Sequence, residues 1–160
     1  NNTFGAFNTA GGHTALRYNT IGYWNTAFGA EALLYNQSFF NTAVGSEALL
    51  SNVAGYDNTA VGAGAMTYNI SGYNNTAVGA ESQVYNLVGA FNTSIGASSL
   101  KYNQVFYNTA LGESAMEYNV LGYYNTAVGR NSMASNVYGA RNTAIGMNTM
   151  IPDNAIAIYG

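Results

Sequence analysis

The chain lacks cysteine, and its 160 residues include only 4 Lys and Arg, 7 Asp and Glu, 1 His and 1 Pro. The absence of cysteine excludes disulfides, thiolate nucleophiles and cysteine-ligated metals. A net charge of −3 with 7% charged residues leaves no basic surface of the kind that binds nucleic acid. Since no run of about 18 apolar residues occurs, the sequence also predicts no insertion into a membrane.

Asparagine is abundant instead, with 23 copies, and 48% of the residues are hydrophobic. The triplet Asn-Thr-Ala, once Asn-Thr-Ser, recurs nine times at steps of 16 or 17 residues, and a second asparagine recurs between the triplets. This regularity is typical of a repeat protein. The first series is Asn8, Asn25, Asn41, Asn58, Asn75, Asn92, Asn108, Asn125 and Asn142. The second series is Asn2, Asn19, Asn36, Asn52, Asn69, Asn86, Asn103, Asn119 and Asn136.

The constant short period indicates that each unit follows the same path and stacks on the previous one. Two glycines per unit would weaken helices by about 1 kcal/mol each, whereas Thr-Ala-Val before a glycine suits a short strand. We therefore predict an all-β fold, a parallel β-solenoid of about nine 17-residue turns, each with two short strands and two glycine corners. Gly29 and Gly55 exemplify the two corners. A single domain is expected over 1–160, with repeats over about 2–151 and an irregular strand over 152–160.

In such a coil, equivalent side chains form columns along the axis. We predict that both asparagine series are structural ladders whose amides hydrogen-bond between turns. Two apolar columns are expected to fill the interior. One comprises Val44, Val61, Val78, Ile95, Leu111, Val128 and Ile145, and the other Leu33, Leu49, Met66, Leu100, Met116, Met133 and Met150. Each triplet threonine lies two residues before the first column, on the same side of its strand, and is therefore expected to face inward as well.

The repeat strings resemble a known family. Residues 58–62 and 125–129 both read Asn-Thr-Ala-Val-Gly, and each is followed by x-x-[AS]-Met-x-x-Asn-x-x-Gly. This pattern is similar to the repeats of bacteriophage tail fibres and bacterial surface fibres. It is more distantly similar to the head repeats of trimeric autotransporter adhesins, which form left-handed parallel β-rolls. The resemblance covers about residues 2–151 and implies a left-handed, extracellular, fibrous protein that associates as a trimer.

Candidate catalytic groups are few. His13 is the single histidine, and no cysteine or second histidine exists to join it in a metal or nucleophilic site. Glu31 and Glu47 share a column about 5 Å apart, a separation used by retaining glycosidases. The same column continues with Gly64 and Ser98, which is typical of a solvated face. We therefore predict no enzyme, no cofactor and no metal site.

Aromatic residues gather at one corner of the repeat, and a second column holds a tyrosine in most turns. Contiguous apolar patches of this kind mark interaction surfaces, so the rings are expected either to bury between subunits or to stack on sugars. The corner comprises Tyr23, Trp24, Phe39, Phe40, Tyr56, Tyr73, Phe91, Phe106, Tyr107, Tyr123 and Tyr124. The second column comprises Tyr18, Tyr35, Tyr68, Tyr85, Tyr102 and Tyr118.

The favoured function is a structural segment of an extracellular fibre or filament, with the chain itself as partner in a homotrimer or an end-to-end assembly. The first alternative is a module that binds surface glycans. A third hypothesis is an ice-binding solenoid that displays the threonine column, although an inward threonine would oppose it.

Overall fold

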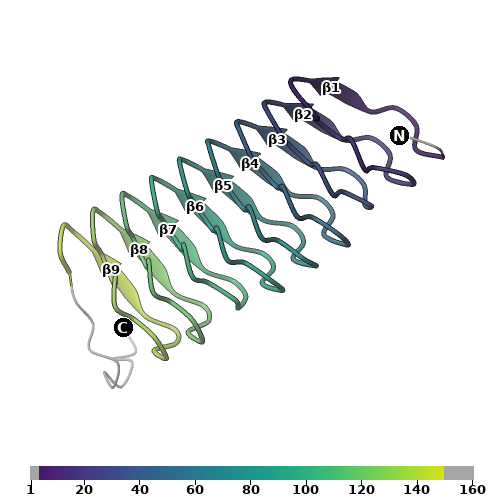
Figure 1. Cartoon of the computed structure of the whole chain (residues 1–160). Helices are drawn as coiled ribbons and strands as arrows, with labels where there is room; N and C mark the ends of the chain where they lie inside the picture. Colours follow the sequence, from purple (N-terminus) through teal and green to yellow (C-terminus); the bar gives the residue numbers. More distant parts are fainter. Residues whose placement is uncertain (1–3, 150–160) are drawn as a thin grey trace.

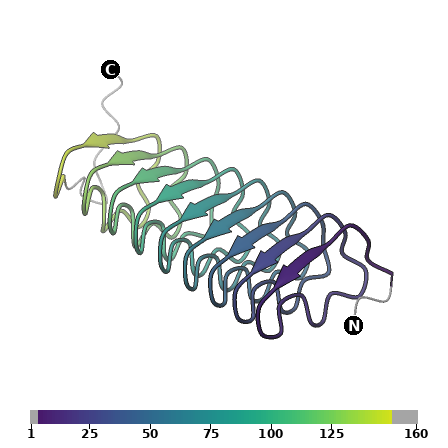
Figure 2. The ribbon, with the colours of Figure 1, turned by 90° about the horizontal axis from the view of Figure 1, so that it is seen from above.

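A computed structural model describes residues 4–149 and shows a parallel β-solenoid (Figure 1). Nine three-residue strands pair in sequence order into one sheet, with each threonine opposite the threonine of the next turn. Seen from above, the strands lie in one even row (Figure 2). The predicted fold is thus confirmed. The strands are β1 (Thr9–Gly11), β2 (Thr26–Phe28), β3 (Thr42–Val44), β4 (Thr59–Val61), β5 (Thr76–Val78), β6 (Thr93–Ile95), β7 (Thr109–Leu111), β8 (Thr126–Val128) and β9 (Thr143–Ile145). The irregular strand predicted over 152–160 and Met150 lie outside the described residues.

Each described turn holds one strand, so the prediction of two strands per turn is wrong. The second half of each repeat is a series of tight turns in which alternate residues have positive φ, as at Glu31 (61°) and Leu33 (52°). The Leu34 amide donates to the Glu31 carbonyl within the turn, while the Leu33 amide donates to Ala48 of the next turn at 3.0 Å. Left-handed backbone costs a non-glycine residue roughly 1–2 kcal/mol. Burial of the leucine side chain and the bonds between turns offset this cost.

The interior is built from alanines and one Leu/Met column. Leu33, Leu49 and Met66 are fully buried, as predicted, and so are the triplet alanines such as Ala43 and Ala60. The prediction that the valine column faces inward is wrong. Val44 is 39% exposed and Ile95 42%. The Leu/Met column fills the space opposite the strands, so only a methyl or hydroxymethyl group fits on the inner side of each strand.

A polar layer interrupts this core between β5 and β6. Gln83 occupies the Leu/Met column and is fully buried. Its Nε2 donates to Ser94 Oγ at 2.9 Å and to the Thr76 carbonyl at 3.2 Å, whereas its Oε1 has no hydrogen-bond partner. Ser82 Oγ lies 2.5 Å from Ser94 Oγ. The layer separates one apolar cluster, from Leu16 to Ala77, from a second that runs from Leu100 to Ala144.

The two glycine corners have different causes. Gly29 has φ 140°, in the region that side chains rarely adopt, and a Cβ there would collide with the Gly45 carbonyl. Gly55 does not have a positive φ, but a Cβ there would collide with Asn52 Oδ1 and the Gly72 carbonyl. Close approach between turns, rather than backbone conformation, therefore selects glycine at the second corner.

The first 16-residue step shows how the coil absorbs a missing residue. Ser38 stands in the place of the second glycine, and its carbonyl accepts from Asn36 Nδ2 at 2.8 Å. The Gln37 side chain reaches the preceding turn, where its Oε1 accepts from the Thr20 amide at 3.2 Å and its Nε2 donates to the Tyr18 carbonyl. A side-chain amide thus makes bonds like those of the deleted peptide group, and the turns stay in register.

Candidate interaction surfaces

The second asparagine series forms a ladder through the interior. Asn69 Nδ2 donates to Asn52 Oδ1 at 2.8 Å and to the Gly72 carbonyl at 2.9 Å, while Asn69 Oδ1 accepts from Asn86 Nδ2 at 3.0 Å. The same pattern links neighbouring members from Asn19 to Asn136. These side chains are fully buried. Apart from Asn136 Oδ1, which has no partner among the described residues, their side-chain amides make their hydrogen bonds within the protein.

The first series ties side chain to backbone. The Asn58 amide donates to Asn41 Oδ1 at 3.1 Å, and Asn58 Nδ2 donates to the Gly72 carbonyl of the following turn at 2.8 Å. Equivalent backbone-to-side-chain bonds occur at each step from Asn8 to Asn142. From Asn25 to Asn142 the exposed fraction does not exceed 6%. Both series therefore hold adjacent turns together.

The aromatic corner, defined as the predicted corner rings together with Phe7, is continuous along the rod. Phe7, Trp24 and Phe40 stack face to face, with centroids 5.5 and 4.9 Å apart. Beside them a second stack runs from Tyr23 through Phe39 and Tyr56 to Tyr73. A third stack comprises Phe91, Tyr107 and Tyr124, and it also contacts Phe106 and Tyr123.

The ring series crosses between two columns without a break. Asp57 and Asn74 replace the aromatic residue in the column that contains Phe91, and Ala90 replaces it in the column that contains Tyr73. At this crossing Tyr73 meets Phe91 edge to face, with centroids 5.3 Å apart. The sequence placed these rings at one corner, but it did not indicate that they form a single contact path.

Stacking determines which part of each ring meets solvent. Trp24 is 49% exposed and Tyr124 50%, although Trp24 is stacked between Phe7 and Phe40 and Tyr124 stacks on Tyr107. The corner therefore displays mainly ring edges and hydroxyl groups. Sugars bind aromatic residues through ring faces, and most faces at this corner are already covered.

The tyrosine column forms a second, separate stack. Tyr68, Tyr85, Tyr102 and Tyr118 lie in sequence with centroids 5.4, 5.2 and 5.1 Å apart. Tyr18 and Tyr35 form a shorter stack. Ser51 stands between the two stacks, so this column does not form a continuous surface.

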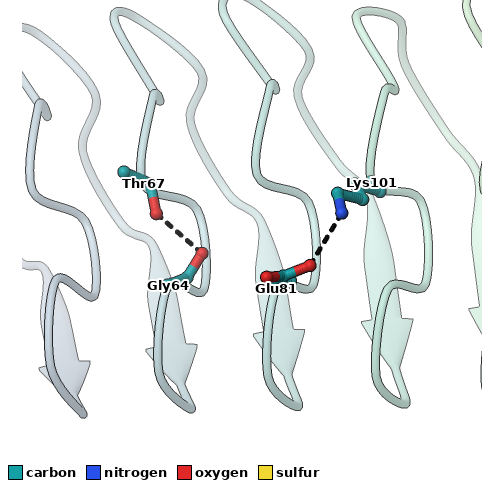
Figure 3. Close-up of polar contacts among 4 residues, drawn as sticks. All are labelled: Gly64, Thr67, Glu81 and Lys101. Atoms are coloured by element: carbon teal, nitrogen blue, oxygen red, sulfur yellow. Dashed lines mark hydrogen bonds and ion pairs between the residues drawn. The ribbon is translucent and has the colours of Figure 1, made fainter.

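A shallow groove lies over the acidic column where Gly64 takes the place of a glutamate. Glu47 and Glu81 flank it from the turns on either side. Thr67 Oγ1 donates to the Gly64 carbonyl at 2.8 Å, and Lys101 Nζ forms an ion pair with Glu81 at 2.7 Å (Figure 3). The hydrogen bond that Lys101 donates to the Glu81 carboxylate raises the pKa of Lys101 above its ordinary value of 10.5. The lysine therefore offsets one of the two carboxylates.

The remaining predicted titratable residues do not converge on a site. Glu31 lies one turn before Glu47, and exposed His13 lies near the first turn, where its carbonyl accepts from the Glu31 amide at 2.8 Å. Residues 4–149 contain no cluster of three His, Cys, Asp or Glu side chains that could hold a metal ion.

The outer side of the sheet carries two regular columns. From β2 to β9 the threonine and the residue two positions later face outward, while the residue between them is buried. The prediction that the strand threonines face inward is therefore wrong, although they do share a side with the valine column. No charged residue occurs in β1–β9.

Comparison with known proteins identified no relative of this chain. No family model, no curated protein and no solved structure matches the chain. Within residues 4–149 there is also no helix long and apolar enough to span a membrane.

Proposed function

We propose that this chain is a structural segment of an extracellular fibre or filament that associates with copies of itself along the aromatic corner. The continuous contact path of twelve rings is the observation that carries the proposal. With twelve rings of roughly 200 Å² each that are a little under half exposed, the corner presents about 1,000 Å² of aromatic surface. The largest apolar patch on a typical monomer is about 300–600 Å². A stable interface buries about 800 Å² on each partner, so the corner is large enough for one.

The ends of the rod support growth along its axis. Among the described residues, β1 pairs only with β2 and β9 pairs only with β8. The edge strands of a sheet are templates for further strands, and β1 and β9 are the edge strands among the described residues, at opposite ends of the row (Figure 1). End-to-end joining and lateral association through the corner are compatible, and a homotrimer is one such lateral arrangement. In this proposal no residue is catalytic, and no cofactor or metal is required.

The glycan-binding alternative is weaker on the same geometry. Ring faces that would stack on a sugar instead stack on one another, as Tyr107 does on Tyr124 at 4.7 Å. Self-association can use ring edges, since edge-to-face contacts between aromatics are favourable. The arrangement at the corner therefore favours a second copy of the chain over a glycan.

Light scattering after size exclusion, together with electron microscopy, tests the proposal. The wild-type chain is expected to give a multiple of 16.9 kDa or filaments. The variant Tyr107→Ser/Tyr124→Ser, which removes two stacked corner rings, should shift the mass toward the monomer. Tyr85→Ser/Tyr102→Ser removes a matched stacked pair from the tyrosine column and should leave the assembly unchanged. A wild-type chain that stays monomeric and forms no filaments at high micromolar concentration contradicts the proposal.

A further inference from the structure

We propose that the outer side of the nine-stranded sheet, hereafter the threonine face, binds the surface of ice. The face combines one column of hydroxyl groups with a second column that is aliphatic from β3 to β9, after Gly11 in β1 and Phe28 in β2, and both follow the repeat of the coil. This inference does not depend on the aromatic corner, and it holds for a single rod as well as for a fibre.

The hydroxyl groups of the threonine face are available to water. Each of the nine strands begins with threonine, and these side chains are half-buried or exposed, as at Thr76 and Thr93. Within residues 4–149 none of these hydroxyls makes a hydrogen bond to the protein. Each therefore retains its donor and its acceptor positions for solvent.

The second column supplies apolar groups in the same register. It contains Val44, Val61, Val78 and Ile95 in four consecutive turns, aligned strand by strand with the threonines. Threonine, valine and isoleucine are all branched at Cβ and strongly restricted in χ1. Since the buried ladders fix the backbone as well, little entropy remains to be lost when the face orders a layer of water.

The spacing of the face is that of a two-dimensional lattice. Neighbouring strands lie about 4.8 Å apart, and residues two apart along a strand are separated by roughly 6.6 Å. Rows of oxygen atoms on the prism faces of hexagonal ice repeat at nearly the distance between strands. A regular, flat and uncharged lattice can hold water in an ice-like arrangement over many turns, whereas charged side chains would impose their own hydration.

A protein partner fits this face less well. Eight steps of about 4.8 Å and a strand about 10 Å long give the face roughly 400 Å². A stable protein interface needs about 800 Å² on each side, so a second copy seated on this face alone would bind weakly. The absence of charge also leaves no pattern for a specific polar partner. An extended crystalline surface of water imposes neither requirement.

Thermal hysteresis, the gap between the melting and freezing points of a single ice crystal, tests the proposal. The wild-type chain is expected to widen this gap and to shape the growing crystal. Thr59→Tyr/Thr76→Tyr places bulky rings in the middle of the face and should abolish both effects. Thr59→Val/Thr76→Val keeps the shape but removes the hydroxyls, and it should weaken the effect less. The matched control Val53→Tyr/Val88→Tyr, at side chains 46% and 48% exposed outside the sheet, should retain full activity.

Circular dichroism and light scattering on every variant separate the other outcomes. A wild-type chain that gives no hysteresis above that of an inert protein overturns the proposal. Equal loss in the face and control variants, with folding intact, also overturns it. A change of mass caused by Thr59→Tyr/Thr76→Tyr would identify the face as an interface between copies and would likewise refute ice binding. The aromatic-corner variants test the fibre independently of these results.

Discussion

Replacing the buried glutamine with a leucine should stabilise the rod. In Gln83→Leu the new side chain matches the residues at equivalent positions in adjacent turns, Met66 and Leu100, both of which are fully buried. The substitution removes the Oε1 atom that has no hydrogen-bond partner. It also joins the two apolar clusters that the polar layer separates.

The expected gain in the free energy of unfolding follows from three contributions. Leaving a buried acceptor unsatisfied costs about 1–3 kcal/mol, and the substitution removes this cost. Full burial of a leucine side chain contributes about 1.5–3 kcal/mol. The two bonds from Nε2 are lost at about 1 kcal/mol each. Ser94 Oγ keeps its contact with Ser82, and the Thr76 carbonyl keeps a bond from Ser94 at 3.4 Å, so neither is left without a partner. The net stabilisation is about 2 kcal/mol, which corresponds to a rise in Tm of roughly 4–8 °C for a chain of this size.

Thermal and urea denaturation followed by circular dichroism measure this change. Since turns in a stacked repeat interact only with their neighbours, a polar layer in the middle divides the wild-type rod into two cooperative units. We expect a broad or two-step transition for the wild type and a single steeper one for Gln83→Leu. The control Gln104→Leu makes the same chemical change outside the core and should alter stability by no more than about 0.5 kcal/mol. A lower Tm for Gln83→Leu, or wild-type unfolding in one sharp step, would refute the reasoning.

Three further variants test the other elements of the coil. Asn69→Ala removes three ladder bonds and leaves Asn52 Oδ1 buried without a partner, so denaturant titration should show a loss of about 3–5 kcal/mol, and a loss below about 1 kcal/mol would exclude the ladder as a major stabilising element. Gly62→Ala forces a side chain into positive φ against the next turn and should cost about 3 kcal/mol or more, measured as the shift in Tm; an unchanged Tm would contradict the steric account. Glu81→Gln should cost less than about 1 kcal/mol, because the ion pair is exposed. Pairing raises the pKa of Lys101 in the folded state. The difference in free energy of unfolding between wild type and Glu81→Gln should therefore be fully present below the ordinary lysine pKa of 10.5 and vanish as the pH rises through the raised pKa. A difference in stability that grows with pH would contradict the assignment.

The spacing of the asparagines was sufficient to predict the coil and its register, because an exact period leaves no freedom in which turn contacts which. It was not sufficient to decide which side of each strand faces inward. In Thr-Ala-Val both possible inner faces contain apolar groups, and a three-residue strand is too short for alternation to choose between them. The choice depends on the width of the interior, which the Leu/Met column of the opposite half sets.

The second half of the repeat was harder to predict for a different reason. Its tight turns require positive φ at residues such as Leu33 and Met66, where no glycine marks the conformation. Contacts between turns impose that geometry, so a single repeat does not carry it. The polar layer, in contrast, had a visible sign in the sequence, since Gln83 departs from a column of leucine and methionine. The aromatic residues were placed correctly in columns, but their crossing from one column to the other depends on side-chain packing.

Every strand contacts only the strands of adjacent turns. Duplicating or deleting one whole repeat inside the rod would therefore replace one set of neighbour contacts by an equivalent set and leave the cross-section intact. Each added repeat would lengthen the molecule by about 4.8 Å. Unequal recombination between such similar segments would thus lengthen or shorten the rod in uniform steps of one repeat, without a change in its cross-section.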